Sequence, residues 1–374
     1  MSAPGEPAAP EVAAATLVNL RGMTPARLRA LFERWPEPED ALDAVRTGRA
    51  LGPLVRAAPA RLRAAVETRA AEWRSECDPA ATARLLLARG TRAWWETSAG
   101  YPVADAVPER PAVLLGEGAD PEVLARPRVA VVGTRQASPA GLADARELGA
   151  YLAEHGVTVV SGLAIGIDGA AHEGALDAGG GAVGVVATGL DVVYPRRHGP
   201  LSARVRSSGL LLSETGYGVG PERRRFPVRN RIIAALADVV VVVEATATGG
   251  ARITARHALE YGRPILAVPG SRRNPAAAGT NALLADGAHP LLEWSDVLIA
   301  LGMTPGPRRR PAPAPELPGD ADAAAVLGAL GGEPASPDQL ATRTGLSIDR
   351  VALAVGRLER AGRVELSRGW AWPR

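Results

Sequence analysis

The stretch that decides the fold is RVAVVGTRQASPAGLADARELGAYLAEHGVTVVSGLA, residues 128–164. The runs RVAVV and VTVVS near its two ends are short, continuously apolar and rich in valine, and the segment between them has apolar residues at helical spacing. Strands without polar alternation are buried on both faces, and a helix between two such strands is the crossover of a parallel sheet. The stretch therefore predicts a strand–helix–strand unit of an α/β domain.

Four further runs of the same kind continue the pattern. They are AVGVVATG (182–189), LLLSE (210–214), DVVVVVEA (238–245) and PILAVPG (264–270). Amphipathic helical stretches separate most of them, and apolar strands that alternate with helices form a parallel sheet covered on both faces. We therefore predict a doubly wound parallel α/β core over residues 127–302.

Three segments precede this core. Residues 1–10 (MSAPGEPAAP) are rich in proline and alanine and are predicted to be a disordered tail. Residues 11–76 carry apolar side chains at helical spacing and predict an all-helical, SAM-like domain, in which LRGMTPARLRALF (20–32) is typical of a helix-hairpin-helix turn. Such a turn can bind a phosphate, or it can serve packing and docking. Residues 77–126 are interpreted as a connector with one short strand at 112–115.

Two segments follow the core. Residues 303–320 (MTPGPRRRPAPAPELPGD) are predicted to be a proline-rich linker. Residues 321–374 show three helical stretches and then two short strands around a turn, which is the order of a winged helix. This last segment holds seven arginines and six acidic residues. Its charge is therefore compatible with docking a protein as well as with binding duplex DNA.

The composition is that of a globular protein and excludes several kinds of site. Of 374 residues 47% are apolar and 22% are charged, and all 43 basic residues are arginine. Without lysine the chain has no P-loop lysine and no Schiff base, so phosphates must be bound by arginine, backbone amides or hydroxyl groups. The single cysteine, Cys77, excludes a disulfide framework and a cysteine-rich zinc site. No apolar run reaches the ~20 residues of a membrane span and no secretion signal is apparent, so we expect a cytoplasmic protein.

Glycine and hydroxyl residues gather where the predicted strands end. Gly133 and Thr134 follow the first strand, and Ser161, Gly162 and Gly166 follow the second. In a doubly wound sheet ligands bind beyond the carboxyl ends of the strands, and glycine lets the backbone approach a ligand closely. We therefore expect a site for an anionic ligand at this edge. The GxGxxG spacing of a dinucleotide site is absent from these loops, and we predict no cofactor.

The segment PERRRFPVRNRIIAAL (221–236) indicates which anion the site holds. Five arginines and one acidic residue lie between positions 221 and 231, with Phe226 in their middle. The candidate side chains of this segment are Arg223, Arg224, Arg225 and Phe226, and Arg135 on the loop after the first strand would face the same crevice. Arginines along phosphates and an aromatic ring against a base are what a groove for a single strand requires. We interpret the crevice as a nucleic-acid site.

A catalytic site or a metal site in the same core is a weaker interpretation of the sequence. Asp168 and His172 lie four residues apart on the second helix with Ser161 upstream, which could build a hydrolase. However, no G-x-S-x-G motif is present, and an aspartate near a helix start is more simply a cap. The pair His172-Glu173 lacks the second histidine of the zinc motif HExxH. We predict neither catalytic residues nor a metal site.

The order and spacing of these motifs resemble the DNA-processing protein A family, also called DprA or Smf. The pieces that carry the resemblance, between residues 131 and 287, are VGTR, SGLAIGIDGAAHEGAL, VVATGLDVVYPRRH, LLSE, FPVRNRIIAAL, VVVEATATGGARITARHALEYGRPILAVPG and GTNALLADGA. The resemblance implies an extended Rossmann-like core and a homodimeric, non-enzymatic protein that binds single-stranded DNA. It further implies that the protein protects incoming DNA and helps to load the RecA recombinase during natural transformation.

The resemblance also assigns residues to the DNA groove. It implies that Arg135, Phe226 and one or more of the arginines 223–225 line the groove, with Arg229 and Asn230 nearby. Two departures are visible: GTR stands where many members have GSR, and TGGARITA where many have SGSLITA. The first departure retains the hydroxyl group, whereas the second loses a serine.

Two other functions stay open. The fold type also resembles LOG-like phosphoribohydrolases, which cleave nucleotide monophosphates, and Gly249-Gly250, Arg252 and Glu260 echo their catalytic loop and helix at a different spacing. The second open hypothesis is a winged-helix regulator with a ligand-sensing core. The phosphoribohydrolase would use the same crevice as the nucleic-acid site.

Overall fold

A computed structural model of the protein describes residues 6–304, 320–330, 334–367 and 369–373. The chain divides into two compact units, 1–304 and 305–374. Residues 1–5 of the predicted tail and 305–319 of the predicted linker lie outside the described residues. The first helix begins at Ala9, so the predicted disordered tail extends too far, because Ala9 and Pro10 are already helical. Among the described helices none is both long and apolar enough to cross a membrane.

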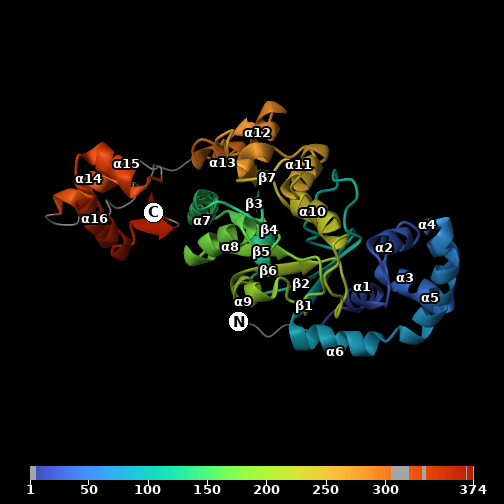
Figure 1. Ribbon diagram of the computed structural model, residues 1–374. Coiled ribbons are helices and arrows are strands. Elements are labelled where there is room, and N and C mark those ends of the chain that lie inside the picture. The colour runs from blue at the N-terminus through green and yellow to red at the C-terminus, as the bar shows by residue number, and fades with distance from the viewer. Residues whose placement is uncertain (1–5, 305–319, 331–333, 368, 374) are drawn as a thin grey trace. The chain divides into compact units, whose positions relative to one another are not determined.

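In the described part of the first unit, nine strands form one sheet in the order β1-β2-β6-β5-β4-β3-β7-β8-β9 (Figure 1). Their bounds are β1 Thr91–Trp95, β2 Val113–Glu117, β3 Arg128–Val132, β4 Thr158–Ser161, β5 Ala182–Val185, β6 Leu210–Ser213, β7 Val239–Val242, β8 Ile265–Ala267 and β9 His289–Pro290. From β6 to β9 all neighbours are parallel, which confirms the parallel core. The sheet as a whole is mixed, because β1 and β2 from the predicted connector extend it in antiparallel pairing.

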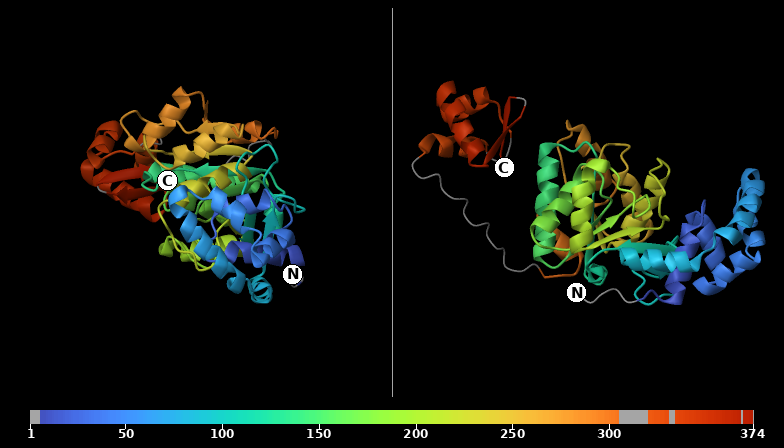
Figure 2. Two further views of the ribbon diagram at one scale, coloured as in Figure 1. Left: turned by 90° about the vertical axis from the view of Figure 1, so that its right-hand side faces the viewer. Right: turned by 90° about the horizontal axis from the view of Figure 1, so that it is seen from below.

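Helices cover both faces of this sheet, as Figures 1 and 2 show. The face of Val129 and Val131 packs on α7 (Pro139–Glu154), α8 (Ile167–Asp177) and α13 (Ser295–Ala300). The face of Ala130 and Val132 packs on α10 (Arg225–Leu236) and α11 (Ala251–Glu260). Successive strand residues point to opposite faces, so a continuously apolar strand is buried on both. The doubly wound fold predicted from the valine-rich runs is confirmed.

The helical N-terminal domain packs at the β1–β2 end of the sheet. Its helices are α1 Ala9–Asn19, α2 Pro25–Phe32, α3 Pro38–Thr47, α4 Leu51–Ala57, α5 Arg63–Glu76 and α6 Pro79–Arg89. In the predicted hairpin turn, the Thr24 side chain caps α2 by accepting from the Arg27 amide at 3.3 Å, and the Trp73 indole donates to the Arg21 carbonyl at 2.9 Å. These contacts serve packing of the turn, because the first fixes it to α2 and the second binds it to α5 inside the same domain.

The second unit folds as predicted from the order of its elements. Three helices, α14 (Ala321–Leu330), α15 (Pro337–Thr344) and α16 (Ile348–Arg360), precede the antiparallel pair β10 (Val364–Ser367) and β11 (Trp370–Pro373). The apolar sides of α14, α15 and α16 form a small core of their own around Val326, Leu340, Val351 and Leu358. This arrangement is a winged helix.

Candidate nucleic-acid interface

The carboxyl ends of the parallel strands line one edge of the sheet, and strand order reverses between β3 and β7. This reversal is where doubly wound folds place an anionic ligand at the start of a helix. Here the position is filled by the chain itself. The buried Glu244 carboxylate, directly after β7, accepts from the Ser138 amide at 2.8 Å and from the Ser138 hydroxyl at 2.7 Å. Ser138 caps α7, so a carboxylate occupies the site that a nucleotide phosphate would take.

A cavity opens beside this reversal, beyond the ends of β3, β4 and β5. The residues that line it are Arg135, Gly162, Ala164, Ile165, Tyr194, Pro195, Phe226 and Arg229. The Arg135 guanidinium carbon lies 5.1 Å from the centre of the Phe226 ring, and that ring lies 5.4 Å from the Tyr194 ring. The Arg135 side chain is exposed, and among the described residues no carboxylate lies within ion-pair distance of it. An unpaired cation and two aromatic rings therefore meet at one mouth.

Arg229 forms the floor of this cavity and is 5% exposed. Its Nη1 donates to the Gly162 carbonyl at 2.8 Å and to the Val185 carbonyl, which ties the ends of β4 and β5 to α10. Burial lowers the pKa of Arg229 to about 10, the Asp168 carboxylate opposes this, and the Arg135 charge adds to it. The guanidinium therefore stays charged at neutral pH. Its neighbour Asn230 accepts from Arg229 at 3.2 Å and donates to the Gly250 carbonyl at 3.2 Å.

The other predicted loop residues shape the cavity from behind. Ser161 is buried, and its hydroxyl donates to the Val131 carbonyl at 2.6 Å. The Thr134 hydroxyl accepts from the Gln136 amide at 3.2 Å and so closes the turn that carries Arg135. Gly166 has φ +87°, and a Cβ there would lie 2.3 Å from the Thr134 carbonyl oxygen. A larger residue would therefore displace the Arg135 loop. Gly133 packs as closely against Ile167 on the other side of that loop.

The three consecutive arginines differ in their partners. Glu222 accepts from Arg224 Nε at 2.6 Å and from Arg225 Nη2 at 2.9 Å. The hydrogen bond from Arg225 lowers the pKa of Glu222 most, and the one from Arg224 lowers it further. Arg223 is exposed, and within the described part of the chain no carboxylate pairs with it. The described residues that line the cavity include none of the three. They directly precede Phe226 in the chain, and Arg223 is the one of the three whose charge is uncompensated.

Tyr194 is a site residue that the sequence patterns did not single out, although the motif VVATGLDVVYPRRH contains it. Its side chain is partly exposed and packs on Phe226. The exposed Arg196 and Arg197 follow it in a 3-10 turn, Arg196–His198. In the described residues neither arginine has a carboxylate partner. An aromatic residue and two arginines after a strand end repeat the composition of segment 221–236, and this was the available signal.

The alternative hydrolase pair does not form. The Asp168 carboxylate accepts from the Gly162 amide at 3.1 Å, so it organises the loop after β4. His172 is fully buried, and within the described residues its two ring nitrogens have no hydrogen-bond partner. Burial lowers the pKa of His172 to about 4, so the ring is neutral at physiological pH. Asp168 therefore holds the loop after β4, and His172 is a buried residue of α8 without a catalytic partner among the described residues.

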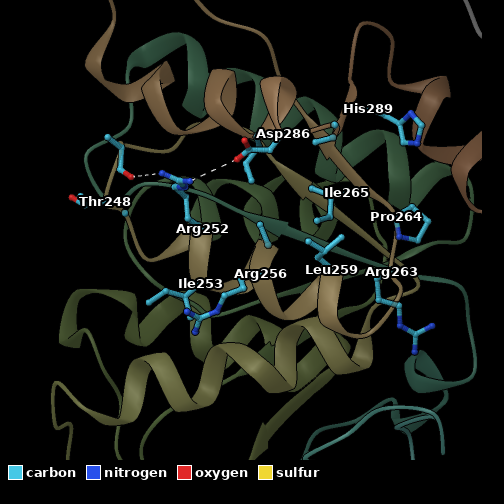
Figure 3. Close-up of a pocket in the computed structure, with 16 residues that line it drawn as sticks. Thr248, Arg252, Ile253, Arg256, Leu259, Arg263, Pro264, Ile265, Asp286 and His289 are labelled. Carbon is cyan, nitrogen blue, oxygen red and sulfur yellow. Dashed lines mark hydrogen bonds and ion pairs between the residues drawn. The ribbon is translucent and has the colours of Figure 1, made fainter.

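A larger cavity lies elsewhere, between α11, α12 (Ala278–Ala285) and the β8–β9 end of the sheet (Figure 3). Arg252 lines it, donates to the Ala247 carbonyl at 2.7 Å and faces Asp286 at 4.0 Å. Glu260 instead contacts Arg256 and His257 at the other end of α11. Eight helical residues separate Arg252 from Glu260 by about 12 Å. At that separation Arg252 and Glu260 do not contact one small nucleotide together, as the phosphoribohydrolase alternative would require.

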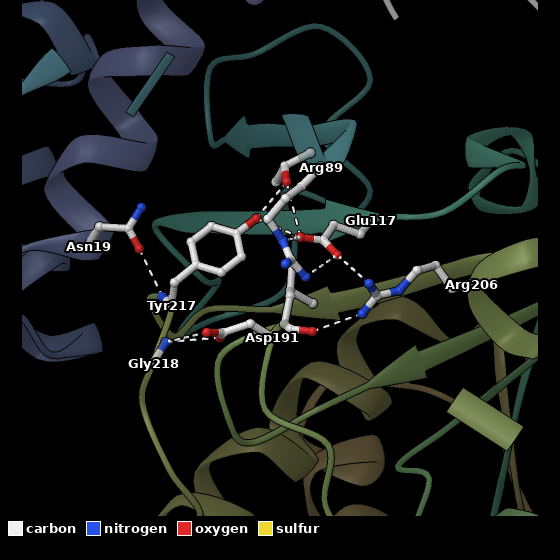
Figure 4. A network of polar contacts seen from close by, with 9 residues as sticks. Asn19, Arg89, Glu117, Asp191, Arg206, Tyr217 and Gly218 are labelled. Carbon is white, nitrogen blue, oxygen red and sulfur yellow. Dashed lines mark hydrogen bonds and ion pairs between the residues drawn. The ribbon is translucent and has the colours of Figure 1, made fainter. Parts of the chain in front are cut away.

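A second arginine cluster lies at the junction of the helical domain and the sheet (Figure 4). Its centre is the Glu117 carboxylate on β2, which is 1% exposed. It accepts from Arg89 Nε at 2.6 Å, from the Tyr217 hydroxyl at 2.7 Å and from the Thr91 hydroxyl at 3.1 Å, and it pairs with Arg206 Nη1 at 2.9 Å. Burial raises the pKa of Glu117, but the hydrogen bonds and charges around it outweigh burial and leave that pKa lowered. We call Glu117, Arg89, Arg206, Thr91 and Tyr217 the Glu117 network.

The Glu117 network also holds the loop between β6 and α10. The Tyr217 amide donates to the Asn19 side chain on α1 at 2.9 Å, and the Gly218 amide donates to the Asp191 carboxylate at 2.9 and 3.0 Å (Figure 4). This loop leads directly to the arginines 223–225. The helical domain is thus connected to the rim of the cavity through ordered hydrogen bonds.

The chain matches models of known protein families. The family model described as DNA recombination-mediator protein A matches residues 93–302, and that of the DprA winged helix domain matches residues 310–369. The chain belongs to the DNA recombination-mediator protein A family. The matched core holds the whole cavity, including Arg135, Tyr194 and Phe226, and the resemblance inferred from the motifs is confirmed.

Relatives in this family are similar over most of their length. A protein named as a DNA processing protein DprA in Mycobacterium tuberculosis is 41% identical over 243 residues, 64% of this chain and 62% of that protein. The X-ray structure of DprA from Streptococcus pneumoniae is 30% identical, with a TM-score of 0.62 over 77% of this chain and 95% of that one. A Helicobacter pylori DprA structure, described by its single-stranded DNA binding mode, is 29% identical, with a TM-score of 0.51 over 56% and 95%. The chain thus spans less than two thirds of the mycobacterial relative.

Proposed function

We propose that this protein binds single-stranded DNA through the cavity of Arg135, Tyr194 and Phe226 and acts on that strand without cleaving it. The observation that carries the proposal is the unpaired Arg135 guanidinium 5.1 Å from the Phe226 ring. A phosphate can pair with Arg135 from solvent, and a base can stack on the ring beside it, worth ~1–3 kcal/mol for each base. Stacking needs an unpaired base, so the cavity favours a single strand over a duplex.

The charge around the cavity supports the same ligand. Arg223, Arg196 and Arg197 are exposed on the segments that carry Phe226 and Tyr194, and they are unpaired within the described residues. A phosphodiester backbone carries one charge at every nucleotide, so a row of free arginines fits a polymer better than a mononucleotide. The helix start at the strand-order reversal, which a nucleotide phosphate would use, is filled by Glu244. The Helicobacter pylori DprA structure is described by its single-stranded DNA binding mode, which is the same ligand class.

The proposal includes the wider role that the family name suggests. In it, the protein works in the cytoplasm, covers single strands that enter during natural transformation, and mediates recombination by helping RecA to assemble on them. A homodimer belongs to the same proposal. It is supported by large apolar side chains that are exposed, namely Leu259 at 73% in the cavity of Arg252, and Leu292 at 73% and Ile299 at 61% in the segment after β9.

Oligonucleotide binding tests the ligand. Fluorescence anisotropy of the full chain with a 20-nucleotide oligo-dT and with a 20-base-pair duplex is expected to show tighter binding of the single strand. The variant R135A/F226A is expected to lose that preference, whereas R84A, which removes an exposed arginine of α6, is expected to keep it. Equal affinity of the wild type for both nucleic acids, or an unaffected R135A/F226A variant, would contradict the proposal.

The partners are tested separately. Sedimentation of the wild type is expected to give the mass of two chains, and L259E/L292E is expected to give one. RecA filament formation on oligo-dT is expected to be faster in the presence of the wild type than of R135A/F226A. A monomeric wild type, or an unchanged RecA rate, would remove the corresponding partner from the proposal while leaving strand binding in place.

A further inference from the structure

A second pair of unpaired arginines lies on another loop of the same sheet edge. Arg272 and Arg273 follow β8 in the loop 268–274, and both are exposed. Across the described ranges neither has a carboxylate within ion-pair distance. The carboxyl end of β8 lies on the same edge as the carboxyl end of β3, because β3, β7 and β8 are consecutive parallel strands. These two arginines therefore belong to the edge that carries Arg135, although the cavity does not include them.

Hydrogen bonds join the loop of Arg272 and Arg273 to the loop of Arg135. Asn274 Nδ2 donates to Glu244 at 3.4 Å, and the same carboxylate accepts from the Ser138 amide and hydroxyl. The backbone carbonyl of Glu244 accepts from the Thr134 amide at 2.7 Å. Glu244 thus fixes both loops to one point at the strand-order reversal. Neighbouring strands are ~4.8 Å apart, so two strand positions separate the two loops by about 10 Å along the edge.

The loop of Arg272 and Arg273 is held in one conformation by its own hydrogen bonds. The Gly270 amide and carbonyl are both bound by the Asn281 side chain, at 3.2 and 2.9 Å, and the Ser271 carbonyl accepts from the Asn274 amide at 2.9 Å. Asn274 also caps the 3-10 turn Pro275–Ala277. A loop that is already ordered loses little backbone entropy when its arginines bind an anion. This is the arrangement of a binding loop.

We propose that Arg272 and Arg273 form a second phosphate-binding subsite for the single strand, distinct from the cavity of Arg135. The inference rests on the proposed function, and it adds a direction to it. The strand leaves the Phe226 ring, passes Arg135, crosses the loops after β3 and β7 above the buried Glu244 carboxylate, and reaches Arg272 and Arg273. The whole path fits within the ~4–16 nucleotides that single-strand-binding folds cover.

Oligonucleotides of two lengths separate this subsite from the cavity. The dinucleotide dTpdT, which holds two bases and one phosphodiester, is short enough to occupy the cavity alone, whereas oligo-dT of 20 nucleotides reaches both regions. We expect R272A/R273A to bind the 20-mer more weakly and to lower its slope of log affinity against log salt by about 1.4, since each phosphate contact on a single strand contributes ~0.7. Binding of the dinucleotide is expected to be unchanged.

The matched control is R61A/R63A, which removes two exposed arginines from the helical domain and changes the net charge equally. It is expected to leave both oligonucleotides unaffected. A second variant, R272E/R273E, is expected to deepen the effect on the 20-mer. An unchanged 20-mer slope, or a loss equal for the dinucleotide and the 20-mer, would overturn the subsite.

The single variant R135A distinguishes this failure from failure of the proposed function. If R135A weakens both lengths while R272A/R273A changes neither, the strand binds the cavity but does not follow the proposed path. If R135A changes neither length, the proposed function itself fails.

Discussion

The Glu117 network and the cavity edge use arginine in opposite ways. In the network, Arg89 and Arg206 converge on one carboxylate that is 1% exposed, and Tyr217 and Thr91 fill its remaining acceptor positions. At the edge, Arg135, Arg223 and Arg272 are exposed without a carboxylate in the described residues. Because the chain has no lysine, residue type does not distinguish the two roles. The presence or absence of a carboxylate partner does.

The winged helix extends this comparison. On α16, Arg350 pairs with Asp322 at 2.5 Å and Arg357 pairs with Asp320 at 2.7 Å. Acidic residues at and just before the start of α14 thus compensate arginines on the helix that a duplex reader would place in the major groove. By the same criterion these arginines stabilise their own domain. Arg360 on the same helix is exposed and has no carboxylate partner among the described residues, so the charge pairing leaves both docking of a protein and binding of duplex DNA open for this unit.

The largest effect is expected when the Glu117 network loses its carboxylate. The variant E117Q keeps the shape of the side chain but leaves Arg89 and Arg206 without a counter-charge. We expect the free energy of unfolding to fall by about 3 kcal/mol, the low end for a broken buried pair, because both guanidinium groups keep some contact with water. Denaturant titration measures this. A loss below about 1 kcal/mol would mean that the network contributes little to stability.

The aromatic platform is expected to give the next effect. The variant F226L removes the ring while keeping an apolar side chain, and stacking of one base is worth ~1–3 kcal/mol, which is a loss of affinity of roughly 5- to 150-fold. Anisotropy with oligo-dT measures it, and F226W is expected to restore binding. If F226L binds as well as the wild type, bases do not stack on this ring.

Converting paired arginines into unpaired ones is a sharper test of the comparison. The variant E222Q removes the carboxylate shared by Arg224 and Arg225 and thereby adds free cations at the rim. We expect affinity for oligo-dT to rise several-fold and the salt slope to increase by about 0.7 for each new phosphate contact. The control E33Q makes the same charge change on an exposed residue of the helical domain and is expected to have no effect. A weaker-binding E222Q would show that Glu222 positions the arginines for DNA instead of neutralising them.

The smallest effect concerns a carboxyl group of α7 near the reversal. Burial raises the pKa of Asp144 to about 6, and the charges of Glu147 and Glu244 add to it. The folded chain therefore binds this proton more tightly than the unfolded chain, and ionisation costs stability as the pH rises from about 4 through 6. D144N is expected to raise the free energy of unfolding by about 1 kcal/mol at pH 7.5, after allowance for solvent screening, and to leave it unchanged near pH 4. Equal effects at both pH values would assign the change to packing.

The core of the fold was predictable from the sequence, because valine-rich runs such as RVAVV and DVVVVV are buried on both faces and signal parallel strands directly. The strand β1 was not predictable in this way. Its sequence, Thr-Arg-Ala-Trp-Trp, has an exposed Arg92 between buried neighbours, and its pairing with β2 depends on the tertiary arrangement of the helical domain. Helix α1 began earlier than predicted because Pro10 is tolerated in a first helical turn.

The candidate site was predictable in composition but not in its pairing. The sequence places Arg135 and Phe226 at strand ends, and the structure brings them to 5.1 Å. The sequence does not reveal that Arg229 and Ser161 are buried and that their polar groups bind backbone carbonyls. Nor does local spacing show that Glu222 compensates Arg224 and Arg225 but not Arg223. Which arginine is free depends on side-chain geometry across loops.

The most direct test of the central claim is one paired measurement on R135A and R89A. For each variant the free energy of unfolding and the salt dependence of oligo-dT binding are measured under the same conditions. We expect R135A to keep the stability of the wild type and to lower the slope of log affinity against log salt by about 0.7. We expect R89A to lose stability and to keep that slope. A stable R135A with an unchanged slope, or an R89A with the wild-type stability and a lowered slope, would contradict it.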